Sequence, residues 1–224
     1  MKISLLCNAG LALQYDGQVL LIDAINGEAE PFCALSDDLW QKILLGEKPF
    51  DNVVALSFTH CHRDHYDESK IRRYMQMHPD VPVLLPGEKS SQGKIVIGAF
   101  EICYKLMPHA PMSEETPPHV VAAISAGERS VYISGDALLD VNLHREFLNG
   151  RKMDVAFWNS MYLSREETRK LMQETAKMNC IYHMPFEKPD AYGLWKKCLS
   201  NYRRYPEELK NVTVLNRYPM EIEV

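Results

Sequence analysis

The 224-residue chain lacks several features that mark specialised classes of protein. Its six cysteines show no C-x-x-C spacing, no apolar run approaches membrane-spanning length, and no secretory signal opens the sequence. The formal charge of -5 gives no excess of positive charge for a broad nucleic-acid-binding face. We find no repeat, linker or Gly-x-Ser-x-Gly motif. We therefore expect one cytoplasmic domain, residues 1–224, with free and mostly buried thiols, no membrane association and no stable nucleic-acid partner.

Hydrophobic patterning predicts alternating strands and helices. Ser36 and Gly46 have the residue types of a helix N-cap and C-terminal cap around residues 37–45. Asp16-Gly17 predicts a hairpin turn, and Pro82 is compatible either with an edge strand or with the first residues of a strand. The predicted strands are 11–15, 18–22, 53–58, 81–85, 94–97, 100–107, 120–125, 130–134, 155–158, 180–182 and 212–215, and the further helices are 68–77, 141–148, 164–178 and 191–204. Two β-then-α halves predict an α/β (α+β) fold, a four-layer αββα sandwich.

A dense cluster of metal-capable side chains follows the apolar strand 53–58. Residues 59–65 read Thr-His-Cys-His-Arg-Asp-His, so His60, His62, Asp64 and His65 fall within six positions. Imidazole nitrogens combined with a carboxylate suit zinc, iron or manganese. A protonated surface cluster would suffer like-charge repulsion, which favours the metal interpretation. Alternation along an extended segment points Cys61 away from the metal.

The motif His60-x-His62-x-Asp64-His65 after a strand is similar to the signature of the metallo-β-lactamase superfamily. Gly135-Asp136, after the strand 131–133, resembles the metal-bridging position of that family. His183, after residues 180–182, resembles its last histidine ligand. The opening segments 3–6 and 19–23 look like its first strands, which end in an aspartate. The resemblance covers roughly residues 3 to 190 and implies the sandwich fold expected above.

The resemblance calls for one more histidine, and two are available. His109 follows the strand-like residues 100–107, and ligands of the family sit at strand ends, which favours it. His119, which precedes residues 120–124, is the alternative ligand. If it is not a ligand, it is a candidate substrate contact, and Tyr162 is a second candidate. The usual His-Thr-Pro-Gly form of this motif is absent, which leaves the geometry of the loop and the subfamily undetermined.

The resemblance implies a dinuclear hydrolase. One divalent ion would be held by His60, His62 and His109. A second would be held by Asp64, His65 and His183, and Asp136 would bridge the two ions. Zinc is the first choice, with iron or manganese as alternatives. A hydroxide shared by the ions would attack a small ester, lactone or phosphodiester, with Asp64 and Asp136 as the catalytic carboxylates. Residues 153–158, 164–177 and 181–183 resemble the ascorbate-6-phosphate lactonase-like branch.

Three other functions remain open on the sequence. They are a di-iron redox protein of the same fold, a nuclease-type phosphodiesterase and a non-catalytic metal-binding protein. The flavin domain or RNA-gripping insertions typical of the first two are not visible. A small-molecule substrate is the expected partner, and the sequence leaves the substrate, the metal and the oligomeric state undetermined.

Overall fold

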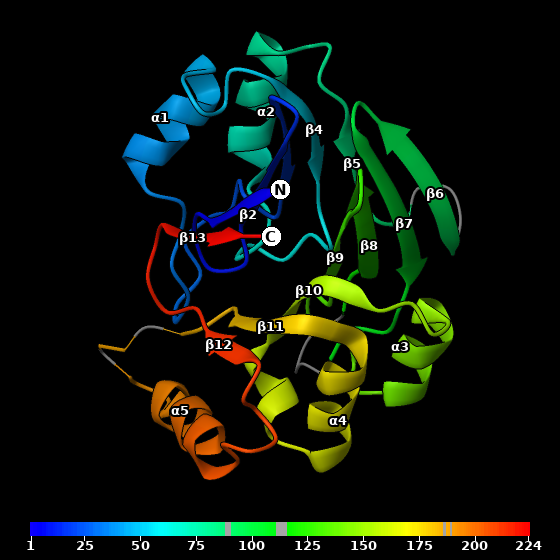
Figure 1. The fold of residues 1–224 in the computed structure, drawn as a ribbon. Coiled ribbons are helices and arrows are strands. Elements are labelled where there is room, and N and C mark those ends of the chain that lie inside the picture. The colour runs from blue at the N-terminus through cyan, green and yellow to red at the C-terminus, as the bar shows by residue number, and fades with distance from the viewer. Residues whose placement is uncertain (88–90, 111–115, 186, 189) are drawn as a thin grey trace.

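The computed structural model describes residues 1–87, 91–110, 116–185, 187–188 and 190–224. These residues form two mixed β-sheets and five α-helices. In Figure 1 the N-terminal half, with its two helices, occupies the upper part of the molecule, and the three later helices lie below. The chain therefore has two halves that each combine strands with helices, as the sequence predicts.

The first sheet has six strands in the order β13-β1-β2-β3-β4-β5. Its antiparallel part runs from β13 to β3, and β4 and β5 continue it in parallel. Helices α1 and α2 belong to this half. The bounds are β1 Lys2–Leu5, β2 Leu11–Tyr15, β3 Gln18–Ile22, α1 Asp37–Leu45, β4 Val53–Ser57, α2 Glu68–Met77, β5 Val83–Leu84 and β13 Met220–Glu223.

The second sheet has seven strands in the order β12-β11-β10-β9-β8-β7-β6. Strands β6 to β9 are antiparallel neighbours, and β9 to β12 are parallel. The bounds are β6 Gln92–Ile97, β7 Phe100–Leu106, β8 Val120–Ala126, β9 Arg129–Ile133, α3 Val141–Leu148, β10 Met153–Asn159, the 3₁₀ helix η1 Ser160–Leu163, α4 Glu166–Thr175, β11 Ala176–Tyr182, α5 Leu194–Arg204 and β12 Val212–Val214.

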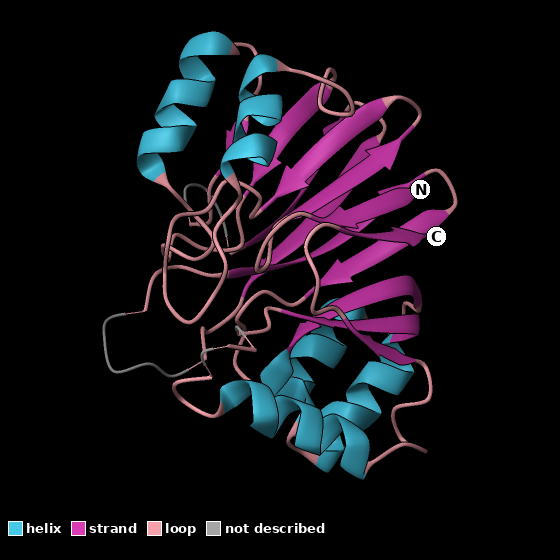
Figure 2. Cartoon of the chain, turned by 90° about the vertical axis from the view of Figure 1, so that its left-hand side faces the viewer, coloured by secondary structure: helices cyan, strands magenta, loops and turns pink. Residues whose placement is uncertain are grey.

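Three apolar clusters separate four layers, which confirms the predicted αββα sandwich. One cluster lies between the sheets and includes Leu13, Ile133 and Phe157. Another packs α3, α4 and α5 on the second sheet, and a third packs α1 and α2 on the first. Figure 2 shows the sheets in the middle with helices on both outer sides. Burial of apolar surface on both faces of both sheets is the main force that holds this arrangement.

The local signals for helix α1 are confirmed. The Ser36 hydroxyl accepts a hydrogen bond from the Leu39 N–H at 3.4 Å, and Gly46 ends the helix with a left-handed φ of 63°. Strand β5, which follows Pro82, is the edge of its sheet. The six cysteines form no disulfide in the described residues, and none of the helices there is long and apolar enough to cross a membrane.

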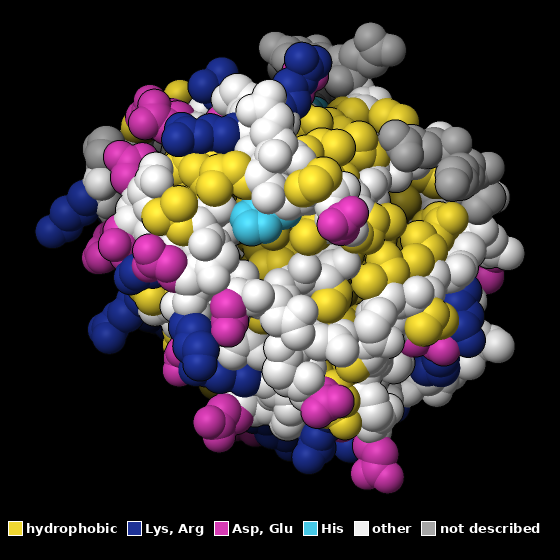
Figure 3. All heavy atoms as spheres, turned by 90° about the horizontal axis from the view of Figure 1, so that it is seen from above, with side chains coloured by type: hydrophobic (Ala, Val, Ile, Leu, Met, Phe, Trp, Pro, Cys, Tyr) yellow, Lys and Arg dark blue, Asp and Glu magenta, His cyan; other side chains and the backbone are white. Residues whose placement is uncertain are grey.

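Two elements differ from the prediction. Helix α4 ends at Thr175, and β11 begins at once with Ala176, four residues before the predicted strand. Parallel pairing of Ala176 with Met153 extends the sheet through residues that have no strong strand signal of their own. Strand β13, which the sequence did not indicate, pairs with β1 beside the N-terminus. Apolar side chains also reach the surface: Figure 3 shows them gathered across the middle and right-hand part of the face seen from above. Leu45 and Met77, the last residues of α1 and α2, are about half exposed.

Candidate metal centre

The candidate ligands lie at one edge of the sandwich, where several strands end. His60, Asp136 and His183 follow the carboxyl ends of β4, β9 and β11. Figure 2 shows the loops from both halves meeting on this side of the strands. Because these strands are anchored in buried sheets, their ends hold the side chains in fixed positions although the residues are far apart in sequence.

His60, His62 and His109 form the first group of donors. Their ligand atoms all lie within 4.8 Å of one another. The Nδ1 atom of His109 lies 2.6 Å from the carbonyl oxygen of Ala110, and because a carbonyl can only accept, Nδ1 carries the proton. The Nε2 atoms of His60 and His109 are buried and have no hydrogen-bond partner in the described residues. Buried nitrogens without partners are costly unless something occupies the space between them, and a metal ion fits this requirement.

Asp64, His65, Asp136 and His183 form the second group, again within 4.8 Å. Nε2 of His183 lies 3.0 Å from Oδ2 of Asp64 and 3.0 Å from Nε2 of His65. Two imidazoles and two carboxylates facing one point are a donor set suited to a divalent ion.

Asp136 stands between the two groups. Its Oδ2 atom lies 4.0 Å from Nε2 of His60 and 3.8 Å from that of His109. The same oxygen lies 3.7 Å from Nε2 of His65 and 3.4 Å from that of His183. One carboxylate oxygen therefore faces histidines of both groups, which is the placement that a shared ligand needs.

Burial and the surrounding charges set the protonation states. Burial raises the pKa of Asp64, but the hydrogen bond from His183 and the neighbouring imidazoles lower it more, to about 2. Burial likewise opposes ionisation of Asp136, and His183 and His65 hold its pKa well below the usual range. Burial, and then the charge of His65, lower the pKa of His60 well below its usual value. Ionised carboxylates and a neutral His60 are the forms that bind metal.

His65 and His183 behave differently because carboxylates surround them. Burial lowers both pKa values, but Asp23 raises that of His65 well above its usual value. Asp136 and Asp64 raise that of His183 to about 9. This part of the site has enough negative charge to attract a cation, and a divalent ion would compete with the proton for the same nitrogens.

Asp23 supports the site from the end of β3. It is wholly buried and accepts hydrogen bonds from Nδ1 of His65 at 2.9 Å and from the N–H and hydroxyl of Thr59, each at 2.7 Å. The bond to Nδ1 leaves Nε2 of His65 free to face the centre. Asp23 has a left-handed φ of 50°, and His183 has one of 56°. Side chains other than glycine adopt this conformation at a cost of about 1–3 kcal/mol, and such residues cluster at functional sites.

Two asparagines complete the support. Nδ2 of Asn8 lies 3.3 Å from Oδ2 of Asp64, and Nδ2 of Asn159 donates to the carbonyl of Gly135 at 3.2 Å. Sequence reasoning gave no site role to these asparagines or to Asp23. The one available signal was position, since Asp23 follows a predicted strand in the segment that resembles the family's opening.

Comparison with solved structures identifies the fold. The metallo-beta-lactamase fold protein YhfI from Bacillus subtilis aligns over 100% of this chain and 99% of its own, with a TM-score of 0.68 and 15% identity. The chain has the metallo-β-lactamase fold. A possible metal-dependent hydrolase from Veillonella parvula is similar over 100% of this chain and 99% of its own, with a TM-score of 0.66 and 14% identity.

The same fold also occurs in CmlA, a diiron beta-hydroxylase from Streptomyces venezuelae. The TM-score is 0.67 at 11% identity, and the alignment covers all of this chain but only 54% of CmlA. No family model and no curated protein matches the sequence. The fold therefore hosts both hydrolases and an oxidative enzyme, and the chemistry of this chain has to be argued from its own residues.

Within the metallo-β-lactamase fold, the structure brings together His60, His62, Asp64, His65, His109, Asp136 and His183. His119 is not in either donor group. Its Nε2 accepts a hydrogen bond from the backbone N–H of Asp136 at 2.9 Å, and burial lowers its pKa to about 3. His119 therefore holds the loop of Asp136 in place and does not line the pocket beside the metal centre.

Tyr162, the other candidate substrate contact, is also absent from the pocket wall. It is completely buried, and its hydroxyl lies 2.6 Å from Nε2 of His144 and 3.4 Å from the carbonyl oxygens of Ala137 and Leu138. The structure places this side chain in the core under the Asp136 loop, because η1, which follows β10, turns it inward.

A cavity of about 560 Å³ opens over the centre. Five of the seven candidate ligands line it, namely His62, Asp64, His109, Asp136 and His183. Apolar side chains form part of its wall, including Phe32, whose ring meets His183 edge to face at 4.3 Å. Two cations, Arg165 and Lys197, also line it. A cavity of this size with a few convergent polar groups is typical of a small-molecule site.

Proposed function

We propose that this protein is a hydrolase of small molecules that uses two divalent metal ions. Zinc is the first candidate, and iron and manganese are the alternatives. The supporting observation is the position of Asp136, whose Oδ2 faces histidines of both donor groups at 3.4–4.0 Å. When bound, two such ions would lower the pKa of a water molecule toward neutrality and polarise the oxygen of a carbonyl or phosphoryl group.

The residues divide this work by position. His60, His62 and His109 would hold one ion, and Asp64, His65 and His183 the other, with Asp136 shared. Asp64 also lines the cavity. Its pKa of about 2 makes it a weak base, so we assign it to orient the attacking water by accepting a hydrogen bond. Cys198, the cysteine on the described wall, is an unsuitable nucleophile because burial raises its pKa to about 12.

The cavity supports a small ester, lactone or phosphodiester as the substrate. Arg165, the N-cap residue of α4, and Lys197 of α5 face it from the wall, and their charges would favour a substrate with a carboxylate or phosphate group. Likeness to the ascorbate-6-phosphate lactonase-like branch in residues 153–183 favours an anionic lactone. Apolar Met161 and Leu194 on the same wall would contact the rest of the molecule.

Elemental analysis of the purified protein, paired with a screen of lactones, esters and phosphodiesters, tests the proposal. We expect about two divalent ions per chain and hydrolysis that His109→Ala abolishes. Lys197→Ala should raise KM for an anionic lactone and leave kcat nearly unchanged, because the contact is remote from the reacting atoms. Lys170→Ala, which removes an exposed cation paired with Glu166 on α4, is the matched control.

Other outcomes would favour other functions. Two irons with a visible absorption band and no hydrolysis would favour a redox protein. A fully metallated protein that hydrolyses nothing in the panel would favour a non-catalytic metal-binding role. Absence of metal, with no activity after zinc or manganese is added, would refute the proposal.

A further inference from the structure

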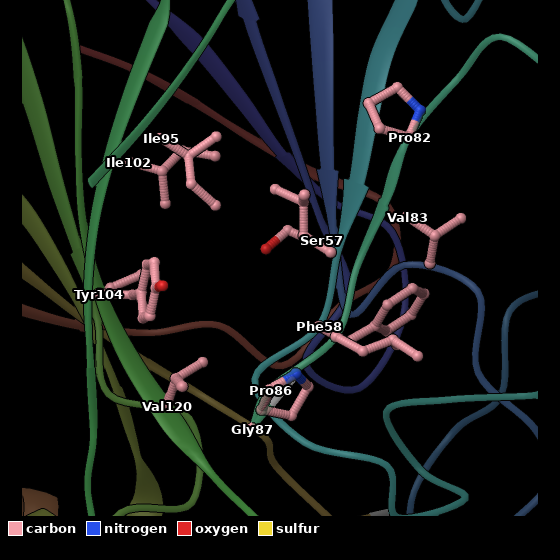
Figure 4. Close-up of a pocket in the computed structure, with 13 residues that line it drawn as sticks. Ser57, Phe58, Pro82, Val83, Pro86, Gly87, Ile95, Ile102, Tyr104 and Val120 are labelled. Carbon is pink, nitrogen blue, oxygen red and sulfur yellow. The ribbon is translucent and has the colours of Figure 1, made fainter. Parts of the chain in front are cut away.

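A second cavity, of about 320 Å³, lies between the two sheets at their open edge. Strand β5 is the edge of one sheet and β6 the edge of the other. One wall comes from the end of β4 and the segment 82–87, and the other from β6, β7 and β8. Figure 4 shows Ile95, Ile102 and Tyr104 facing Ser57 across this space. The cavity shares no described lining residue with the one over the metal centre.

The sandwich stays open here because the edge strands do not close it. Strand β5 has only two residues, and it pairs with β4 through Leu56–Val83 and Ser57–Leu84. Strand β6 alternates exposed and half-buried residues, so Ile95 on its inner side is not fully covered. Its partner across the ladder, Ile102, is 3% exposed and belongs to the core. The edge therefore presents inward-facing apolar side chains to an unfilled space.

The wall has a definite chemical character. Its described residues include no charged side chain. Most are apolar, and the hydroxyl of Ser57 is directed into the space (Figure 4). On the opposite wall, the hydroxyl of Tyr104 lies beside Gly93 of β6. An apolar space of this kind accepts apolar molecules, and a buried charge without a partner there would be costly.

We propose that this inter-sheet cavity is a second ligand site, for a neutral and mainly apolar small molecule with one hydrogen-bonding oxygen. Its apolar part fills the space between Ile95, Ile102 and Leu84, and its oxygen bonds to the hydroxyl of Ser57. The volume is at the lower end of the range for small-molecule pockets, which limits the ligand to a short chain or a single ring. Because the two cavities have separate walls, both sites can be filled at once.

Titration of the metal-loaded protein with 1-octanol, followed by NMR of isoleucine methyl groups, tests this site. We expect saturable shifts of the Ile95 and Ile102 methyls, and unchanged signals from Ile43 of α1 and Ile181 of β11, which belong to the two clusters between the helices and the sheets. Octanoate and octylammonium should bind at least roughly tenfold more weakly, because each would bring a charge to an uncharged wall. Ser57→Ala should weaken 1-octanol binding by roughly threefold to tenfold.

A matched pair of variants on β6 separates filling of the cavity from general disturbance. Ile95→Trp places an indole in the space and should abolish binding. Val96→Trp changes the neighbouring residue, which is 66% exposed on the other side of the strand, and should bind as the native protein does. Absence of saturable binding, equal binding of octanoate, or shifts confined to other isoleucines would overturn the proposal. If Ile95→Trp fails to fold, the native shifts and Ser57→Ala still decide it.

Discussion

Replacement of Asp23 by asparagine tests how far the buried support controls the metal centre. The carboxylate accepts three hydrogen bonds, from two donors of Thr59 and from Nδ1 of His65. Asparagine keeps the shape but offers a single oxygen and two N–H donors. If its oxygen faces His65, its NH₂ meets the Thr59 N–H donor to donor. If it is reversed, the NH₂ favours the His65 tautomer with the proton on Nε2, the atom needed for the metal.

Both orientations carry a calculable cost. One buried donor left unsatisfied costs about 1–3 kcal/mol, so the free energy of unfolding of the metal-free protein should fall by about that amount. Loss of a partner that orients a metal-binding histidine lowers metal affinity by about 10–100-fold. Urea denaturation measures the first quantity, and zinc titration in competition with a chelator of known affinity measures the second.

Asp154→Asn provides the control. Asp154 also accepts from a backbone N–H and a hydroxyl, those of Ser130 at 2.9 and 3.2 Å, and pairs with Lys177. It lies near the start of β10, at the opposite end of the strand from Asn159. We expect a stability loss with unchanged zinc affinity. Zinc affinity of Asp23→Asn within twofold of native, or an equal loss in Asp154→Asn, would refute the reasoning.

Three further predictions follow from the same region. Gly135→Ala should destabilise the protein by about 1–3 kcal/mol and reduce its metal content, because φ is 51° and a Cβ there would collide with His119. Gly150→Ala is the control in both assays, because φ is 74° at Gly150 and a Cβ there would enter open space. Burial lowers the pKa of His144 from 6.5 to about 4, so as the pH falls this histidine takes up a proton in the unfolded state first. The free energy of unfolding, measured by urea denaturation at each pH, should fall by up to about 3 kcal/mol between pH 6.5 and pH 4, and it should fall less in His144→Gln. Chelation of bound metal should lower Tm by about 5–10 °C if ions are present at about 100 times Kd, and unchanged Tm by calorimetry would contradict metal binding.

Local sequence signals predict the elements whose determinants lie close together. His60 to His65 are presented by one loop after an apolar strand, and Ser36 and Gly46 bound α1 within ten residues. Strand β13 was missed because its partner β1 lies near the other end of the chain. Its own sequence, Met-Glu-Ile-Glu, alternates apolar and charged residues as a half-buried strand does, but it is too short to predict a strand alone. Long-range pairing of this kind adds to a weak local signal.

The support of the centre was harder to predict than its candidate ligands. Asp23 meets Thr59 and His65 only after β3 and β4 pair in parallel, so its partners cannot be read from spacing. His109 follows β7 and His119 precedes β8, so both lie next to a strand. They differ in their partners: Nε2 of His119 accepts from the backbone N–H of Asp136, a contact that no local pattern encodes, and His109 is the one that joins the donor group.

The left-handed backbone of Asp23 and His183 has a consequence for how this protein can be improved or can evolve. Glycine would relieve the backbone strain at both positions, but it would also remove a buried partner. At position 23 the two donors of Thr59 would be left unsatisfied, and at position 183 Asp64 and Asp136 would lose the imidazole that pairs with both. A screen for heat resistance, with or without zinc in the medium, should therefore preserve both residues, so selection for stability alone would keep these two parts of the metal centre.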